Sequence, residues 1–284
     1  MQISTFFKFI KIELSLFALP WTLAAAFFAL KTTDPPWHMW LWMLMAFFAA
    51  RTAGMSLNRL IDRHIDAKNP RTADRLLPSG HVKVTEAFAI AALSLILFFV
   101  ACAMINGICL LLSPLVALLI VAYSSTKRWT AGCHFVLGLI YLLSPLMAWA
   151  AFTGDLAWAP VFLGLASMCS VAGTEIIYSL QDLDFDRAEH LHSIPVSFGE
   201  RTSIAIAATL HLLAVVFLLV FGLSLSLSWF WTLGVSLIAL RYLAFYFQLA
   251  QKNPLEKICF SCNTSVALIL ILVTFGEWSW HTLF

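Results

Sequence analysis

The sequence predicts an all-α integral membrane protein, with nine transmembrane helices in a single domain that covers residues 1–284. Of the 284 residues, 61% are hydrophobic and only 11% are charged, whereas soluble domains carry roughly 25% charged residues. Apolar runs of about 20 residues, the length that crosses a bilayer, recur along the whole chain. The alternating ten-residue segments that are typical of outer-membrane barrels do not occur in it.

This composition excludes several classes of protein. So few charges could not cover the surface of a water-soluble enzyme, and such an apolar chain is neither a disordered protein nor a secreted disulfide scaffold. A formal net charge of +2 gives no indication of nucleic-acid binding. The expected solvent of the chain is therefore the lipid bilayer.

Each expected span is one apolar run bounded by polar or turn-forming residues. In chain order the spans cover residues 13–30, 38–57, 84–103, 107–126, 133–152, 158–181, 203–222, 227–249 and 258–276. The segment Lys31–Pro36 separates the first span from the second, and Gln251–Pro254 precedes the last.

The basic residues orient these spans. Fourteen of the 17 Lys and Arg residues lie in the N-terminal segment or in the loops after the second, fourth, sixth and eighth spans. Only Lys31 lies on the opposite side, while Arg51 and Arg241 fall inside spans. Because cytoplasmic loops carry an excess of Lys and Arg, we expect the N-terminus and these four loops to be cytoplasmic, in the inner (cytoplasmic) membrane of a cell.

A polar stripe ends the second span. Asn58, Asp62 and Asp66 are spaced four apart, so they share one face of a helix. Arg51, seven residues before Asn58, lies on the same stripe about two turns deeper in the membrane. A solvated helix end would explain the basic residues nearby, but it would not explain why the acids align with Asn58 and Arg51.

A second acidic stripe ends the sixth span, on the same side of the membrane. Asp182 and Asp186 share a face, while Asp184 points the other way. Glu175, seven residues before Asp182, extends the stripe into the membrane. An ionisable residue inside a span is costly unless it is paired or hydrated, and this cost makes it a functional candidate.

Basic residues lie next to both acidic stripes. Pro70 ends the helix of the second span, and Arg71 and Arg75 follow in the loop. The fourth span ends in Tyr123-x-x-x-Lys127, again on the expected cytoplasmic side. An aromatic residue and a lysine are common at membrane interfaces, so this third motif gains meaning only from its position beside the other two.

The three motifs together predict chemistry on a diphosphate. Carboxylates on two helices can hold Mg²⁺, a hard cation that prefers carboxylates and substrate phosphates. Nearby Arg71, Arg75 and Lys127 can neutralise the remaining phosphate charge. A diphosphate held in this way becomes a good leaving group. The 24 Phe and 11 Trp residues could line a cavity for an isoprenoid tail and shield an allylic cation.

At these residues the sequence resembles the UbiA superfamily of intramembrane aromatic prenyltransferases. The resemblance is sharpest in four stretches: Asn58-x-x-x-Asp62-x-x-x-Asp66, the loop from Asn69 to Gly80, Tyr123-x-x-x-Lys127, and Asp182-x-x-x-Asp186 with the following His192-Ser193-Ile194-Pro195. It implies nine helices around a central cavity that opens toward the cytoplasm and the bilayer. It also implies two Mg²⁺ ions that bridge a polyprenyl diphosphate, and an allyl cation attacked by an electron-rich aromatic ring.

The resemblance assigns roles residue by residue. Asn58, Asp62, Asp66, Asp182 and Asp186 match the metal–diphosphate site, with the four aspartates and Lys127 as the catalytic set. Arg71, Arg75, Tyr123 and Lys127 match the diphosphate contacts, and Arg51 and Asn58 match the acceptor contacts. An alternative for Arg51 is an ion pair with Glu175 that only joins two helices.

Within the family, the amino-acid sequence of the first motif is most similar to that of the 4-hydroxybenzoate polyprenyltransferase branch of ubiquinone and menaquinone synthesis. A similar branch prenylates a dihydroxynaphthoate in the futalosine route to menaquinone, and both acceptors stay open. Two alternatives of other classes are disfavoured. A secondary transporter would place its ionisable residues near the membrane midplane, and a CDP-alcohol phosphatidyltransferase would need one contiguous acidic motif that the chain lacks.

Overall fold

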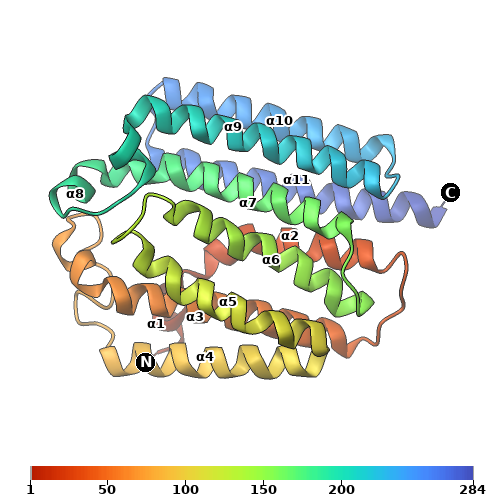
Figure 1. Cartoon of the computed structure of the whole chain (residues 1–284), viewed down its shortest axis with the longest axis horizontal. Helices are drawn as coiled ribbons and strands as arrows, with labels where there is room; N and C mark the ends of the chain where they lie inside the picture. The colour runs from red at the N-terminus through yellow and green to blue at the C-terminus, as the bar shows by residue number, and fades with distance from the viewer. Residues whose placement is uncertain (1, 284) are drawn as a thin grey trace.

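The structure is a computed structural model that describes residues 2–283, with side chains described as far as Ser279. Every regular element in this part of the chain is a helix, and the long helices run side by side in one bundle (Figure 1). Nine of the described helical segments are long and apolar enough to cross a membrane. The prediction of an all-α protein with nine transmembrane helices is confirmed.

The element bounds follow the apolar runs. The elements are α1 (Ile3–Ile10), η1 (Ile12–Leu14), α2 (Ser15–Ala29), α3 (His38–Lys68), α4 (Val84–Ile105), α5 (Gly107–Thr126), α6 (Cys133–Thr153), α7 (Trp158–Tyr178), η2 (Ser179–Asp182), α8 (Leu183–Ala188), α9 (Ile194–Ser224), α10 (Trp229–Ala250) and α11 (Leu255–Leu283). η1 continues into α2, and α7 continues through η2 into α8, so each series forms one span-length segment.

Two helices are longer than the spans expected from hydropathy. The span of α3 was expected over 38–57 and its helix to continue to Pro70; the helix ends at Lys68, two residues before Pro70. α9 was expected from 203, and its bounds begin at Ile194, where the Ser193 hydroxyl accepts a hydrogen bond from the Val196 amide. The backbone is not helical at Gly199, where φ is 77°, so a short first turn is joined to the long helix through a kink. Both extensions lie at the end of the bundle that carries the acidic motifs.

The N-terminal segment forms an element that hydropathy alone did not predict. α1 is short and amphipathic, and its buried Phe9 and Ile10 pack with Leu60 and Leu77 in a small apolar cluster beside α3. The next residue, Lys11, has a left-handed backbone conformation with φ of 47°. This turn joins α1 to η1 and brings Lys11 to the edge of the central cavity.

α7 lies in the middle of the bundle, where it packs against α6 and α9. Small residues allow this close approach: a Cβ atom at Gly173 would lie 2.9 Å from His211 Nε2 and 3.1 Å from the Ala207 carbonyl oxygen of α9. In contrast, the outer faces of the bundle expose large apolar side chains such as Leu111, Leu223 and Leu272. Such an apolar exterior is what a bilayer solvates.

One end of the bundle gathers the polar motifs. α8, the loop after α3 and the α8–α9 connection lie together there, at the left of Figure 1. The loop after α5 joins this group, because the Lys127 carbonyl oxygen accepts a hydrogen bond of 2.6 Å from the His192 amide. We call this end, which carries the three motifs, the mouth of the bundle.

Candidate active site

The two acidic motifs meet at the mouth from different helices. Asp66 at the end of α3, Asp182 at the end of η2 and Asp186 in α8 are all buried, whereas Asp184 is exposed. The alternation agrees with the face expected from the spacing. The second motif is not one regular helix, however, because η2 is a 3-10 turn that gives way to α8 at Leu183.

In the first motif, each carboxylate faces an arginine. Asp62 lies 3.3 Å from Arg128 Nη2 and accepts a hydrogen bond of 2.9 Å from the Asn58 amide. Asp66 accepts two hydrogen bonds, of 2.7 and 2.8 Å, from Nη1 of Arg75. The predicted alignment of Asn58 with the acids is therefore present as a direct contact.

The second motif shows the same arrangement. Arg71 binds Asp182 through two parallel hydrogen bonds, of 2.9 Å from Nε and 2.5 Å from Nη2. The Asn69 amide donates a further bond of 3.0 Å to Asp182. Lys127 Nζ lies 3.5 Å from Asp186 Oδ2, so the loop after α3 and the loop after α5 both reach across to this motif.

The charges at the mouth shift the titration of its basic groups. Burial lowers the pKa of Lys127, but the nearby acidic groups, led by the carboxylate of Asp186, together raise it above the usual 10.5. Burial likewise opposes the charge of Arg71, but the hydrogen bonds to Asp182 raise its pKa. Lys11 differs: burial, followed by the nearby Arg59 and Arg75, lowers its pKa.

A cavity of about 430 Å³ extends from the mouth into the bundle. Asn58, Arg59, Arg75 and Tyr123 line it near the mouth. Beyond them its walls are mostly apolar and aromatic, contributed by Phe17, Trp21, Met43, Phe47, Phe98, Ile105, Val116 and Met147. The central cavity that the resemblance implied is present, and it extends from Asn58 and Arg75, the hydrogen-bond partners of Asp62 and Asp66, into an apolar interior.

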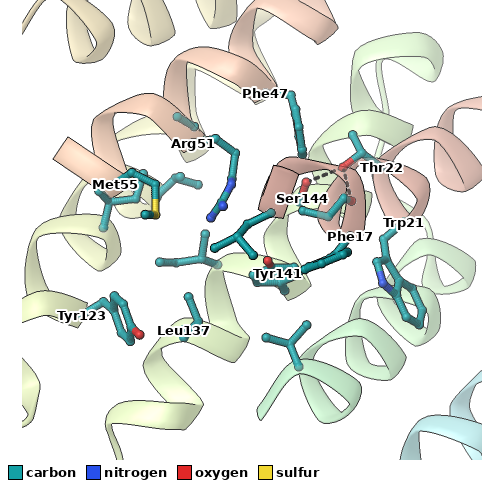
Figure 2. Close-up of a pocket in the computed structure, with 18 of the residues that line it drawn as sticks. Phe17, Trp21, Thr22, Phe47, Arg51, Met55, Tyr123, Leu137, Tyr141 and Ser144 are labelled. Carbon is teal, nitrogen blue, oxygen red and sulfur yellow. Dashed lines mark hydrogen bonds between the residues drawn. The ribbon is translucent and has the colours of Figure 1, made fainter. Parts of the chain in front are cut away.

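Arg51 points from α3 into this cavity, toward the side where Tyr123 and Tyr141 lie (Figure 2). Its Nε is buried without a hydrogen-bond partner. Further in, the Thr22 and Ser144 hydroxyls form a hydrogen bond of 2.7 Å with each other. Arg51 is thus a cationic group within a largely apolar space.

The alternative for Arg51, an ion pair with Glu175, does not form. Both residues line the cavity, and within the described part of the chain no ion pair of 4 Å or less joins Glu175 to any cation. The space between α3 and α7 at this depth is therefore open to a ligand.

The donor set at the mouth fits a hard divalent cation bound together with phosphate. Across the described residues no three His, Cys, Asp or Glu side chains converge on one point, since each carboxylate faces its own cation. Mg²⁺ does not require such a cage, because it is held by one or two carboxylates plus substrate phosphates. Oδ2 of Asp186 is buried and has the ion pair with Lys127 but no hydrogen-bond partner, which suits a metal-ligand atom.

The sequence reasoning missed several contributors to the site. Arg59 is buried and lies 3.9 Å from Asp66. Arg128 faces Asp62, and Tyr178 accepts a hydrogen bond of 3.2 Å from Arg71. Tyr178 was detectable, because its spacing from Glu175 and Asp182 places it on the α7 stripe. The burial of Arg59 was not detectable, because the sequence around it reads as an ordinary charged helix end.

Sequence comparison relates the chain to known prenyltransferases. The UbiA prenyltransferase family matches residues 18–278. A 4-hydroxybenzoate octaprenyltransferase of Vibrio vulnificus is 30% identical over 259 residues, which cover 89% of either chain. The corresponding enzyme of Marinobacter nauticus is 32% identical over 217 residues, covering 76% of this chain and 73% of that protein.

Solved structures show the same fold. An apo UbiA homologue from Aeropyrum pernix has a TM-score of 0.85 at 29% identity, covering 94% of this chain and 98% of its own. A UbiA homologue from Archaeoglobus fulgidus bound to GPP and Mg²⁺ has a TM-score of 0.77 at 19% identity, covering 97% and 99%. The family match over most of the sequence, the shared fold and the paired acidic motifs show that this chain belongs to the UbiA prenyltransferase family.

Proposed function

We propose that this protein transfers a polyprenyl group from a polyprenyl diphosphate to an aromatic acid of the 4-hydroxybenzoate type, in quinone biosynthesis. The observation that carries the proposal is the paired arrangement at the mouth. Carboxylates from α3, η2 and α8, each opposite a cation, lie beside an apolar cavity that contains one arginine without a counter-ion. The names of the relatives, 4-hydroxybenzoate octaprenyltransferases, support the same acceptor.

Asp62, Asp66, Asp182 and Asp186 would hold Mg²⁺ in this proposal, with Asn58 steadying Asp62 through its amide. When bound, the metal neutralises the charge that grows on the diphosphate oxygens as the prenyl C–O bond breaks. The Archaeoglobus fulgidus homologue was solved with Mg²⁺ bound, which is a property of that protein. For this chain the choice of Mg²⁺ rests on the oxygen-only donor set.

The cations at the mouth would bind the diphosphate. Arg71, Arg75 and Lys127 are already held near the metal ligands by their ion pairs. These cations would face the phosphate oxygens of the bound diphosphate. The planar guanidinium groups of the arginines suit two-point contacts to phosphate. Tyr123, which lines the cavity beside them, would orient the leaving group.

Arg51, with Asn58, would bind the acceptor. Arg51 lies about two helical turns deeper in the membrane than Asn58 on α3. A guanidinium without a partner is costly at that depth. The carboxylate of an aromatic acid would satisfy it and present the ring to the reactive end of the prenyl chain. We propose further that residues 1–284 act as a single unit in the inner membrane, with the N-terminus and the mouth facing the cytoplasm, as the basic loops indicate.

A membrane assay tests this function. The purified protein in lipid discs receives one labelled polyprenyl diphosphate, with 4-hydroxybenzoate or a dihydroxynaphthoate as acceptor, with and without Mg²⁺. We expect Mg²⁺-dependent prenylation of 4-hydroxybenzoate. Prenylation of the dihydroxynaphthoate alone would move the protein to the related menaquinone reaction. A protein that consumes no diphosphate but carries a solute across the membrane would be a transporter.

A further inference from the structure

Glu175 is an ionisable side chain to which the reaction described so far gives no role. Three acidic residues line the cavity: Glu13, Glu175 and Glu256. Glu13 and Glu256 are exposed, near the N-terminal ends of their helical segments. Glu175 alone among these three lies well inside a membrane-spanning segment, where an unpaired carboxylate is costly and therefore a functional candidate.

The face of α7 fixes where Glu175 points. Val171, Thr174, Glu175 and Tyr178 all line the cavity, and their spacing of three and four residues marks one side of the helix. Glu175 makes no hydrogen bond or ion pair with any other described residue. Its carboxylate is therefore available to a molecule within the cavity.

The depth of Glu175 separates it from the metal ligands. Glu175 precedes Asp182 by seven positions, which corresponds to roughly 10 Å along a helix at about 1.5 Å per residue. Arg51 on α3 and Glu175 on α7 line the same cavity. Glu175 therefore faces the space in which Arg51 would hold the acceptor ring.

The proposed reaction needs a proton acceptor beside the acceptor ring. The donor C–O bond breaks and its electron pair leaves with the diphosphate. A π pair of the ring forms the new C–C bond, and the ring regains aromaticity only when the C–H electron pair returns to it and the proton leaves. Water is an inefficient acceptor inside an apolar cavity, so a positioned carboxylate would supply general-base catalysis, typically about 10²–10⁴-fold.

We propose that Glu175 is the general base that removes the ring proton after the prenyl group has been transferred, an inference that rests on the proposed function. The carboxylate takes the proton from the ring carbon and then loses it to solvent at the mouth. Arg51 on the opposite wall holds the acid group of the same ring, so the two residues bind one acceptor from two sides. The absence of an Arg51–Glu175 ion pair keeps both groups available for this task.

The experiment compares Glu175→Gln with the wild-type protein in lipid discs, with Glu13→Gln as the matched control. Prenylated product and released diphosphate are measured in the same reactions, using 4-hydroxybenzoate and its ring-deuterated form. In Glu175→Gln we expect product formation to fall about 100-fold or more. Diphosphate release should fall much less, because ionisation of the donor precedes proton loss and water captures the unreacted prenyl cation as the prenyl alcohol.

A primary isotope effect from the ring deuterium should appear in Glu175→Gln and be absent in Glu13→Gln. Glu175→Asp, which keeps a carboxylate, should recover part of the product rate. Melting curves establish that each variant is folded. Unchanged product formation in Glu175→Gln would overturn the inference. So would a loss in which product and diphosphate fall together without an isotope effect, since that pattern indicates a structural role. Absence of prenylated product from the wild-type protein would instead contradict the proposed function.

Discussion

His211 and Arg51 are both polar side chains deep in the helix bundle, but their surroundings differ. His211 of α9 is fully buried, and its Nδ1 lies 2.7 Å from the Tyr246 hydroxyl of α10. Its Nε2 faces Thr174 at 3.2 Å and the Ser170 carbonyl at 3.3 Å on α7, and its ring stacks on Tyr242 at 4.2 Å. Every polar atom of the imidazole has a partner.

Arg51 has the opposite environment. Its Nε is buried without a partner, and the nearest acid expected from the sequence, Glu175, forms no ion pair with it. A buried polar group that is satisfied rigidifies a fold, whereas one that is left unsatisfied costs free energy. The difference indicates that the His211 network holds α7, α9 and α10 together, and that the cavity groups complete their contacts with a ligand.

The largest effect should come from the metal ligands. Asp182→Asn removes one metal-binding charge, an effect worth several kcal/mol in such sites, so turnover should fall by about 1000-fold or more. Product formation at saturating Mg²⁺ measures it. Asp184→Asn is the matched control, because Asp184 belongs to the same motif but is exposed. Near-normal turnover in Asp182→Asn would remove the second motif from the mechanism.

Arg51→Lys sharpens the comparison within the cavity. The lysine keeps the charge but loses the planar group that binds a carboxylate at two points. Since a charge-assisted hydrogen bond contributes about 1.5–3 kcal/mol, the acceptor KM should rise about 10- to 100-fold. The donor KM should change little, and an acceptor without a carboxylate should be less affected. Lower thermal stability with unchanged acceptor kinetics would place Arg51 with the structural groups instead.

Lys127→Ala should have a smaller effect, on donor use. We expect a higher KM for polyprenyl diphosphate and a reduced kcat, about 10-fold in each, because the leaving-group charge grows in the transition state. A change confined to the acceptor KM would show that Lys127 contacts the aromatic acid.

The raised pKa of Lys127 adds a pH dependence. The folded-state pKa of Lys127 lies above the unfolded value of 10.5. The stabilisation of the fold by the Lys127–Asp186 pair is therefore fully present below pH 10.5, and it is lost as the pH rises through the folded-state pKa. Lys127 therefore stays charged between pH 7 and 9.5, and its contribution to the donor KM should be constant over that range. A donor KM that rises within that range in the wild-type protein but not in Lys127→Ala would contradict this assignment.

The smallest effect on turnover should come from the satisfied network. His211→Phe keeps the ring that stacks on Tyr242 but removes its hydrogen bonds, which leaves the Tyr246 hydroxyl without its partner. Thr174 keeps its hydrogen bond to the Ser170 carbonyl oxygen. Stability should fall by about 2–3 kcal/mol. Turnover per folded molecule should stay within a few-fold of the wild type. A large loss of turnover in a stably folded variant would show that the network takes part in the reaction.

Hydrophobic periodicity predicted the helices, the side of each motif and the face that each acid occupies. It could not predict which cation each acid meets. The partners Arg71 and Asp182 are 111 residues apart, and only the packing of α3 against its neighbours brings their loops together. The 3-10 turn of η2 was also not predictable, because Asp182 and Asp186 have the spacing of a regular helix.

The burial of Arg59 could not be predicted from the sequence for a similar reason. A helix end rich in arginine is normally solvated, and only the packing of α1 and of the loop after α3 covers this one. Arg51 and Glu175 line the same cavity. Whether Arg51 and Glu175 form an ion pair depends on the distance between α3 and α7 across the cavity. The spacing of residues in the sequence does not predict that distance.

Joint binding of metal and diphosphate at the mouth is the central claim, and a melting experiment tests it most directly. The purified protein is melted with Mg²⁺ alone, with inorganic diphosphate alone and with both, beside Asp182→Asn and Asp184→Asn. A ligand at 100 times its Kd stabilises the folded state by about 2.7 kcal/mol. We predict a rise in Tm for the wild-type protein and Asp184→Asn only when both ligands are present, and none for Asp182→Asn. Equal stabilisation of Asp182→Asn, or no stabilisation of the wild type, would contradict the assignment of this site.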